Sequence, residues 1–168
     1  MITGKGKMIM NKNVRVPVKG EALPNRFLNY HPDDLPDVYV MASEGKCLEP
    51  EIMDGAKLMF SRIDAYKPGD LVAIFKKREF TVPGDHQVLV KRLILAPHKR
   101  FWQDPKSYDG GNIAPIVIAE MLNPRKLLHF DVAGLLGIHK CIGPVPQGYK
   151  TFKVTDNWLR DQARQRNA

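Results

Sequence analysis

The chain has 168 residues, of which 43% are hydrophobic and 26% charged, a balance typical of a soluble globular protein with one core. The two cysteines, Cys47 and Cys141, are too few for a disulfide framework and lack the spacing of a metal site, and the longest apolar run is too short to cross a bilayer. We therefore expect a cytoplasmic protein that uses no metal or other cofactor and does not enter a membrane.

The net charge of +8 is concentrated at the two ends of the chain. Residues 1–20 carry five basic side chains and no acidic one, residues 149–168 carry five basic and two acidic ones, and the body between them is neutral. Basic ends attract nucleic acid weakly and without sequence specificity, or an acidic protein partner. They also simply keep frayed ends soluble, and both interpretations stay open.

Residues 1–37 show no fixed apolar period and contain four prolines, which predicts an extended basic arm. This arm has neither the length nor the helical pattern of a helix-turn-helix DNA-binding domain. We expect it to be followed by one domain over residues 38–148 and by a C-terminal segment, residues 149–168, that contains a short helix.

From residue 38 onward, short β-prone runs alternate with turns that contain proline and glycine. The predicted strands cover residues 38–41, 57–60, 71–75, 87–95, 113–121 and 132–141, and a further β-prone run lies at 80–82. Short helices are predicted at 49–53 and 156–166. We therefore expect a mostly β fold, a partly open antiparallel barrel or sandwich with short helices.

The most informative segment is residues 45–55, Gly-Lys-Cys-Leu-Glu-Pro-Glu-Ile-Met-Asp-Gly. It resembles the nucleophile motif of the LexA-like self-cleaving peptidases, which include UmuD and the phage repressors: Gly-Asp-Ser-Met-Glu-Pro, followed shortly by Asp-Gly. The positions that match are Gly45, Glu49, Pro50, Asp54 and Gly55. At the others, Lys46 replaces the aspartate, Leu48 the methionine and Cys47 the nucleophilic serine.

Later segments resemble further parts of the same family, in the same order. Residues 68–72 (Pro-Gly-Asp-Leu-Val) are similar to a strand start, residues 90–93 (Val-Lys-Arg-Leu) to the strand with the catalytic lysine, and residues 121–124 (Met-Leu-Asn-Pro) to an Asn-Pro turn. The resemblance implies the LexA peptidase type of fold, with Cys47 as the nucleophile and Lys91 as the general base. It also implies a homodimer and a regulatory role like that of UmuD, in the SOS response or a phage context.

A lysine beside the thiol has a chemical purpose. A thiol is a poor nucleophile until a base removes its proton, and a solvated lysine, with a pKa of about 10.4, is protonated at neutral pH. Burial among apolar neighbours favours the neutral amine, and Lys91 lies in a predicted strand beside Val90 and Leu93. Backbone amides after Cys47, at the start of the predicted helix 49–53, are the expected donors to a developing oxyanion.

The same residues allow a second interpretation, because a free cysteine is often a small buried hydrophobe and a strand lysine is often solvated at a sheet edge. Two functions stay open: a regulatory peptidase that lacks its own DNA-binding domain, and a catalytically inactive module of the same fold that dimerises and docks a protein or nucleic acid. The five histidines are expected at the surface or in loops. The basic aromatic segment 98–111 is either a partner contact or a loop that folds back on the barrel.

We predict that the protein does not cleave its own arm at the position used by this family. Family members cut an Ala-Gly or Cys-Gly bond ahead of the domain, and residues 1–46 contain neither dipeptide. Incubation at alkaline pH, where a lysine base loses its proton, is the most demanding condition, and mass spectrometry should find only the intact chain. A product that begins within residues 11–25 and is not formed by Cys47→Ala would contradict this prediction.

Overall fold

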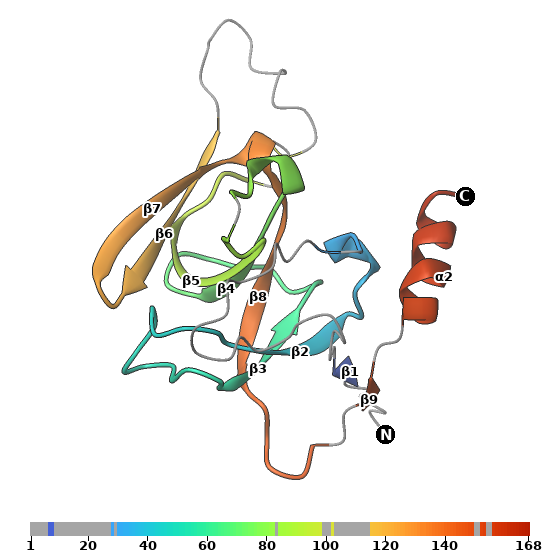
Figure 1. Ribbon diagram of the computed structural model, residues 1–168, viewed down its shortest axis with the longest axis horizontal. Helices are drawn as coiled ribbons and strands as arrows, with labels where there is room; N and C mark the ends of the chain where they lie inside the picture. Colours follow the sequence, from blue (N-terminus) through green and yellow to red (C-terminus); the bar gives the residue numbers. More distant parts are fainter. Residues whose placement is uncertain are drawn as a thin grey trace, which may run out of the picture.

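The computed structural model of the chain describes residues 7–8, 28, 30–82, 84–98, 102, 115–149, 152–153 and 156–168. Most of the predicted arm (1–37) and of the basic aromatic segment 98–111 lies outside these residues. Within them the protein is mostly β with one α-helix, as the sequence predicts (Figure 1). None of the helices in this part has the length and apolar character needed to span a bilayer.

Seven strands form the main sheet of the described residues: β2 (Val38–Ala42), β3 (Lys57–Ser61), β4 (Leu71–Lys76), β5 (Val88–Leu95), β6 (Ile116–Leu122), β7 (Arg125–Asp131) and β8 (Leu135–Pro144). Their order is β7-β6-β5-β4-β8-β3-β2, and every neighbouring pair is antiparallel. Two strands of two residues each, β1 (Lys7–Met8) and β9 (Phe152–Lys153), extend the sheet in parallel beyond β2. Within the described residues the edge strands β7 and β9 do not pair with each other, so the sheet is open and not closed into a barrel.

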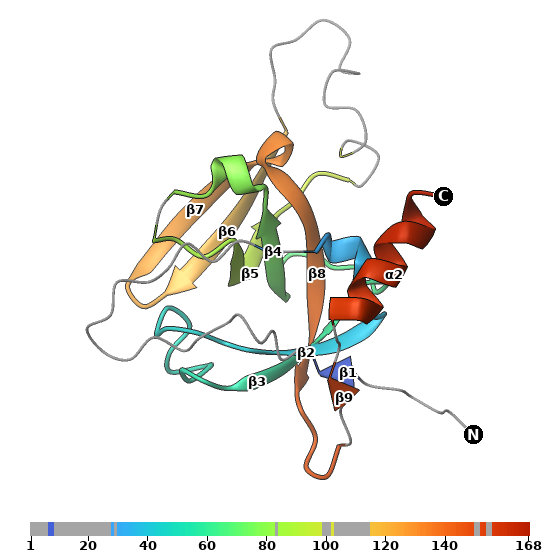
Figure 2. The ribbon, with the colours of Figure 1, turned by 45° about the vertical axis from the view of Figure 1, so that its right-hand side comes forward.

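Strand β4 lies between two apolar clusters, because its residues are apolar and mostly buried on both faces. The first cluster contains Tyr39, Leu58, Phe60, Ala73 and Phe75. The second cluster contains Val72, Ile74, Leu93, Val117 and Ala119. Figure 2 shows the corresponding halves of the molecule: β4 to β7 stand above β2 and β3, and the long β8 runs from one half to the other.

Three details of the predicted elements are wrong. Residues 49–53 do not form a helix but hydrogen-bonded turns, because Pro50 supplies no N–H and disfavours helical backbone at Glu49. The run 80–82 is not a strand: Phe80 ends the 3-10 helix η2 (Arg78–Phe80), and residues 81 and 82 follow it without regular structure. The last long strand begins three residues later than predicted, after the 3-10 helix η3 (Val132–Gly134).

The sequence pattern predicts neither strand β7 nor the burial of His139, and each has a physical reason. β7 is an edge strand on which the apolar Leu127 is 62% exposed, so its sequence lacks the alternation of a half-buried strand. His139, expected at the surface, is 4% exposed, and its Nδ1 lies 2.7 Å from the Tyr39 hydroxyl. This hydrogen bond satisfies two polar groups inside the core, which makes their burial tolerable.

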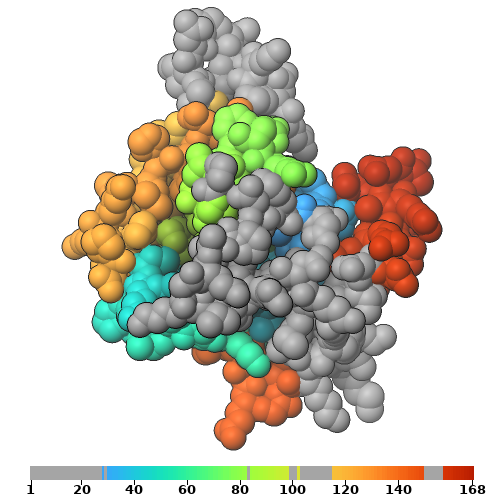
Figure 3. Space-filling model, viewed as in Figure 1, coloured from blue at the N-terminus to red at the C-terminus, as the bar shows by residue number. Residues whose placement is uncertain are grey.

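The helix α2 (Asp156–Arg166) has the predicted bounds and forms a projection on one side of the molecule in Figure 3. Leu159 is buried in the first cluster, and Trp158 packs against it. At the end of the helix, Arg166 Nε lies 2.8 Å from Oδ1 of Asp34, whose side chain is 2% exposed. Asp34 belongs to the 3-10 helix η1 (Pro32–Asp34), so this ion pair ties the end of the chain to the start of the domain.

We predict that Arg166→Met lowers the free energy of unfolding by about 1 kcal/mol, because the buried carboxylate of Asp34 loses its cation. The matched control is Arg164→Met, whose side chain is 81% exposed and pairs with Asp161 on the same helix. It should change the free energy by less than about 0.5 kcal/mol. Urea unfolding followed by tryptophan fluorescence measures both variants, and equal losses would show that the ion pair does not anchor α2.

Candidate active site

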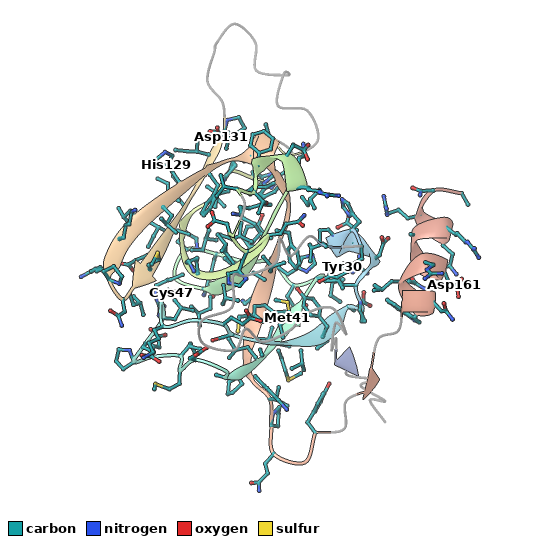
Figure 4. The ribbon with its side chains drawn as sticks, viewed as in Figure 1. Tyr30, Met41, Cys47, His129, Asp131 and Asp161 are labelled. Carbon is teal, nitrogen blue, oxygen red and sulfur yellow. The ribbon has the colours of Figure 1, made fainter. Side chains whose placement is uncertain are left out.

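The side chains of Cys47 and Lys91 meet in the structure. Lys91 Nζ lies 3.0 Å from Cys47 Sγ and 3.0 Å from the carbonyl oxygen of Val90. Lys91 is only 6% exposed, whereas Cys47 is half-buried. The thiol is therefore accessible to small molecules while the amine is largely withdrawn from water. Figure 4 shows Cys47 on the side of the molecule away from α2.

The strand pairing of β5 determines where Lys91 points. Lys91 lies directly opposite Val72 of β4. Directly opposed residues share a face of the sheet, and so do residues two apart on a strand, which places Lys91 on the same face as Val72 and Leu93. Both neighbours belong to the second cluster. The amine therefore leaves the sheet on an apolar face, as its predicted desolvation requires.

Cys47 lies on the loop of residues 43–56, which joins β2 to β3 and is closed by its own polar groups. The Gly45 amide donates to Oδ1 of Asp54 at 2.8 Å, and the Gly55 amide donates to the Ser43 carbonyl oxygen at 2.9 Å. Gly45 and Gly55 have φ angles of 84° and 81°, which glycine adopts far more readily than other residues. Three of the motif positions, Gly45, Asp54 and Gly55, thus shape the loop that presents the thiol.

The remaining motif residues build the tight turn around Cys47. The Glu49 amide donates to the Lys46 carbonyl oxygen at 3.1 Å, and the Ile52 amide donates to that of Leu48 at 3.0 Å. The Leu48 side chain is 2% exposed and anchors the turn in the interior, whereas Pro50 is exposed. Leu48 and Glu49 therefore help to hold the turn that positions Cys47.

A second contact holds the turn from the opposite side. The Cys47 carbonyl oxygen accepts hydrogen bonds from the amides of Leu122 at 2.8 Å and Asn123 at 3.1 Å, at the turn between β6 and β7. The sequence similarity at residues 121–124 indicates a turn there, but nothing in the sequence shows that this turn binds the backbone of Cys47. The site is thus assembled from three separate parts of the chain: the loop 43–56, β5 and the β6–β7 turn.

Arg92, the residue after Lys91, provides a further link. Its guanidinium forms an ion pair with Glu51 on the loop, and Nη1 donates to the Gly69 carbonyl oxygen at 3.0 Å. Two neighbouring residues of β5 therefore contact the same loop: Lys91 contacts the thiol of Cys47, and Arg92 contacts Glu51, four residues further along the loop. The predicted Val-Lys-Arg segment contains Arg92, but its partner Glu51 could not be inferred from sequence.

The backbone around Cys47 offers donors for a developing negative charge. Within the described residues, the amides of Cys47 and Leu48 donate no hydrogen bond to another protein group. Such amides are available to the oxyanion that develops on a carbonyl oxygen when the sulfur attacks its carbon. The expected contribution of a helix N-terminus is absent, because the predicted helix 49–53 does not form.

The electrostatic surroundings distinguish the two cysteines and the two buried lysines. In the part of the chain that the structure describes, no carboxylate forms an ion pair with Lys91. Burial lowers the pKa of Lys76, the positive charge of Lys91 lowers it further, and Asp85 opposes both effects. Burial raises the pKa of the Cys141 thiol, which packs against the first cluster and therefore holds less thiolate at neutral pH.

Among the described residues, no three His, Cys, Asp or Glu side chains lie close enough to hold a metal ion. Comparison of the chain with protein-family models, with curated proteins and with solved structures found no match.

We predict that iodoacetamide alkylates Cys47 faster than Cys141 at neutral pH, because burial raises the pKa of the Cys141 thiol and so lowers its thiolate fraction, whereas the Cys47 sulfur lies 3.0 Å from Nζ of Lys91. Peptide mapping by mass spectrometry assigns each rate to its cysteine. Lys91→Met should slow the alkylation of Cys47 and leave that of Cys141 unchanged. Equal rates at the two cysteines would contradict this prediction. So would a Cys47 rate that Lys91→Met leaves unchanged, because the amine would then have no influence on the reactivity of the thiol.

Proposed function

We propose that this protein is a regulatory peptidase in which Cys47 is the nucleophile and Lys91 transfers its proton. The observation that carries the proposal is the 3.0 Å contact between Lys91 Nζ and Cys47 Sγ, made by a lysine that is 6% exposed. The similarity of residues 45–55 and 90–93 to the LexA-like peptidases supports the peptide bond as the target. A lysine needs no third residue to act as a base, in contrast to a histidine dyad that a carboxylate orients.

In the first step, Lys91 accepts the thiol proton and the Cys47 sulfur attacks the carbonyl carbon of the scissile bond. The carbonyl oxygen gains the negative charge, and the amides of Cys47 and Leu48 are the donors nearest in the chain to stabilise it. The Val90 carbonyl oxygen accepts a hydrogen bond from Nζ and keeps the amine directed at the sulfur. The proton moves within a pair without net charge, which burial favours.

In the second step, the C–N bond breaks and the Lys91 ammonium donates its proton to the departing amine, which leaves an acyl thioester on Cys47. Water then enters, and the neutral amine of Lys91 accepts one of its protons as the oxygen attacks the thioester carbon. The C–S bond breaks, the sulfur recovers a proton from Lys91, and the carboxylic acid product leaves. Lys91 thus serves as base and acid in both halves of the cycle.

The first test uses p-nitrophenyl acetate, an activated ester that acylates a nucleophilic thiol without a recognition sequence. We predict a burst of nitrophenol close to one equivalent per chain, followed by slower turnover. Cys47→Ala should abolish the burst, and Lys91→Met should slow acylation roughly 10²- to 10⁴-fold, the usual contribution of a general base. Cys141→Ser is the control and should behave as the unaltered protein.

Peptide specificity is tested with a pool of peptides, in which new N-termini are counted by mass spectrometry after incubation with the protein or with Cys47→Ala. We expect cleavages that depend on both Cys47 and Lys91. Cleavages that persist in Cys47→Ala would overturn the proposed mechanism. In the ester experiment, an acetyl group found on Cys141 in place of Cys47 would do the same.

A further inference from the structure

The cysteine at position 47 gives the site a chemistry that a serine in the same place would lack. A thiolate is oxidised by peroxide to a sulfenic acid, and a sulfenic acid condenses with a nitrogen nucleophile to a sulfenamide. Cys47 is half-buried and thus within reach of a molecule as small as hydrogen peroxide. The nearest nitrogen nucleophile is already in contact, because Lys91 Nζ lies 3.0 Å from the sulfur.

We propose that peroxide converts the pair into a covalent Lys91–Cys47 sulfenamide, a reversible cross-link that switches the site off. The inference rests on the same pair as the proposed function and assigns to it a second, regulatory state. In the linked form the sulfur is no longer a nucleophile and the nitrogen is no longer a free base. Peptide hydrolysis would therefore stop until the link is reduced.

The two steps balance. In the first, the Cys47 thiolate attacks one oxygen of hydrogen peroxide, the O–O bond breaks, and the products are the sulfenic acid and hydroxide, so the sulfur loses two electrons to the peroxide. In the second, the neutral Lys91 amine attacks the sulfur, the S–O bond breaks, and the sulfenic hydroxyl leaves as water with one proton from the amine. The nitrogen keeps its other proton in the S–N link, and the hydroxide of the first step takes up a proton from solution. A low-molecular-weight thiol later reverses the change through attack on the sulfur of the S–N bond.

Geometry favours the second step over further oxidation. Reacting atoms about 3–3.5 Å apart are in a near-attack arrangement, and the Nζ–Sγ distance falls within this range. Lys91 is 6% exposed, and its two hydrogen-bond partners are the sulfur and the Val90 carbonyl oxygen. In the described part of the chain no carboxylate forms an ion pair with the amine. A buried amine already in contact with the sulfur is well placed to trap the sulfenic acid before a second peroxide arrives.

The alternative cross-link, a disulfide between the two cysteines, is not favoured by their positions. Cys141 belongs to β8, lies opposite Phe60 and packs against the first cluster. Burial raises the pKa of its thiol, so it is a poor partner for exchange at neutral pH. Both cysteines are free in the structure.

The test is made in a Cys141→Ser background, which removes the disulfide as an explanation. The protein is treated with a small excess of hydrogen peroxide, and its intact mass is measured before and after addition of dithiothreitol. We expect a product about 2 Da lighter than the untreated chain, which dithiothreitol returns to the starting mass. Digestion should yield a cross-linked pair of peptides, one with residue 47 and one with residue 91.

Two variants in the same background serve as controls, Lys91→Arg with the charge retained and Lys91→Met without it. Both should gain oxygen, about 16 Da per atom, and neither should lose 2 Da. The inference is overturned if the parent protein only gains oxygen, or if either Lys91 variant shows the same loss. The readout is mass and not turnover, so a cross-link without hydrolysis would refute only the peptidase, and hydrolysis without a cross-link would refute only the switch.

Discussion

The contact between the Lys91 amine and the Cys47 sulfur is the interaction on which the rest of this structure depends. A lysine that is 6% exposed has lost most of its hydration, and within the described residues its nitrogen gains two partners in return, the sulfur and the Val90 carbonyl oxygen. Burying an amine away from water is costly unless it is hydrogen-bonded, so the contact with the sulfur offsets part of that cost. The contact that stabilises the buried amine is also the contact on which the proposed reactivity of the sulfur rests.

The scaffold around the pair works by limiting where each group can move. The loop 43–56 is closed by the Gly45–Asp54 hydrogen bond. The amides of Leu122 and Asn123 bind its Cys47 carbonyl oxygen, and Arg92 links it to β5 through an ion pair. β5 in turn is fixed by its pairing with β4, whose two faces lie in two different clusters. The most deeply buried strand thus supports the base, while hydrogen bonds rather than a helix support the nucleophile.

Much of this arrangement could be predicted from the sequence, and the parts that could not have physical reasons. Most strand positions follow from local patterns, since apolar runs between glycine and proline turns leave few alternatives. The expectation that Cys47 meets Lys91 comes instead from the resemblance of residues 45–55 and 90–93 to known motifs. The helix expected at 49–53 fails because Pro50 interrupts it. The hydrogen bond between Tyr39 and His139 spans 100 positions and depends on the sheet order β8-β3-β2, which local patterns do not encode. The Cys47 carbonyl contacts are non-local in the same way.

The central claim, that the thiol and the amine form one energetic unit, is tested most directly by a double-mutant cycle on stability. The free energy of unfolding is measured for the unaltered protein, Cys47→Ala, Lys91→Met and the double variant. Cys47→Ala alone leaves a buried amine short of a partner and should cost about 1–3 kcal/mol, whereas Lys91→Met in that background should recover most of the loss. The account predicts a coupling of at least about 1 kcal/mol between the two positions. Losses that add within about 0.5 kcal/mol would contradict it, because the two side chains would then be neighbours without being partners.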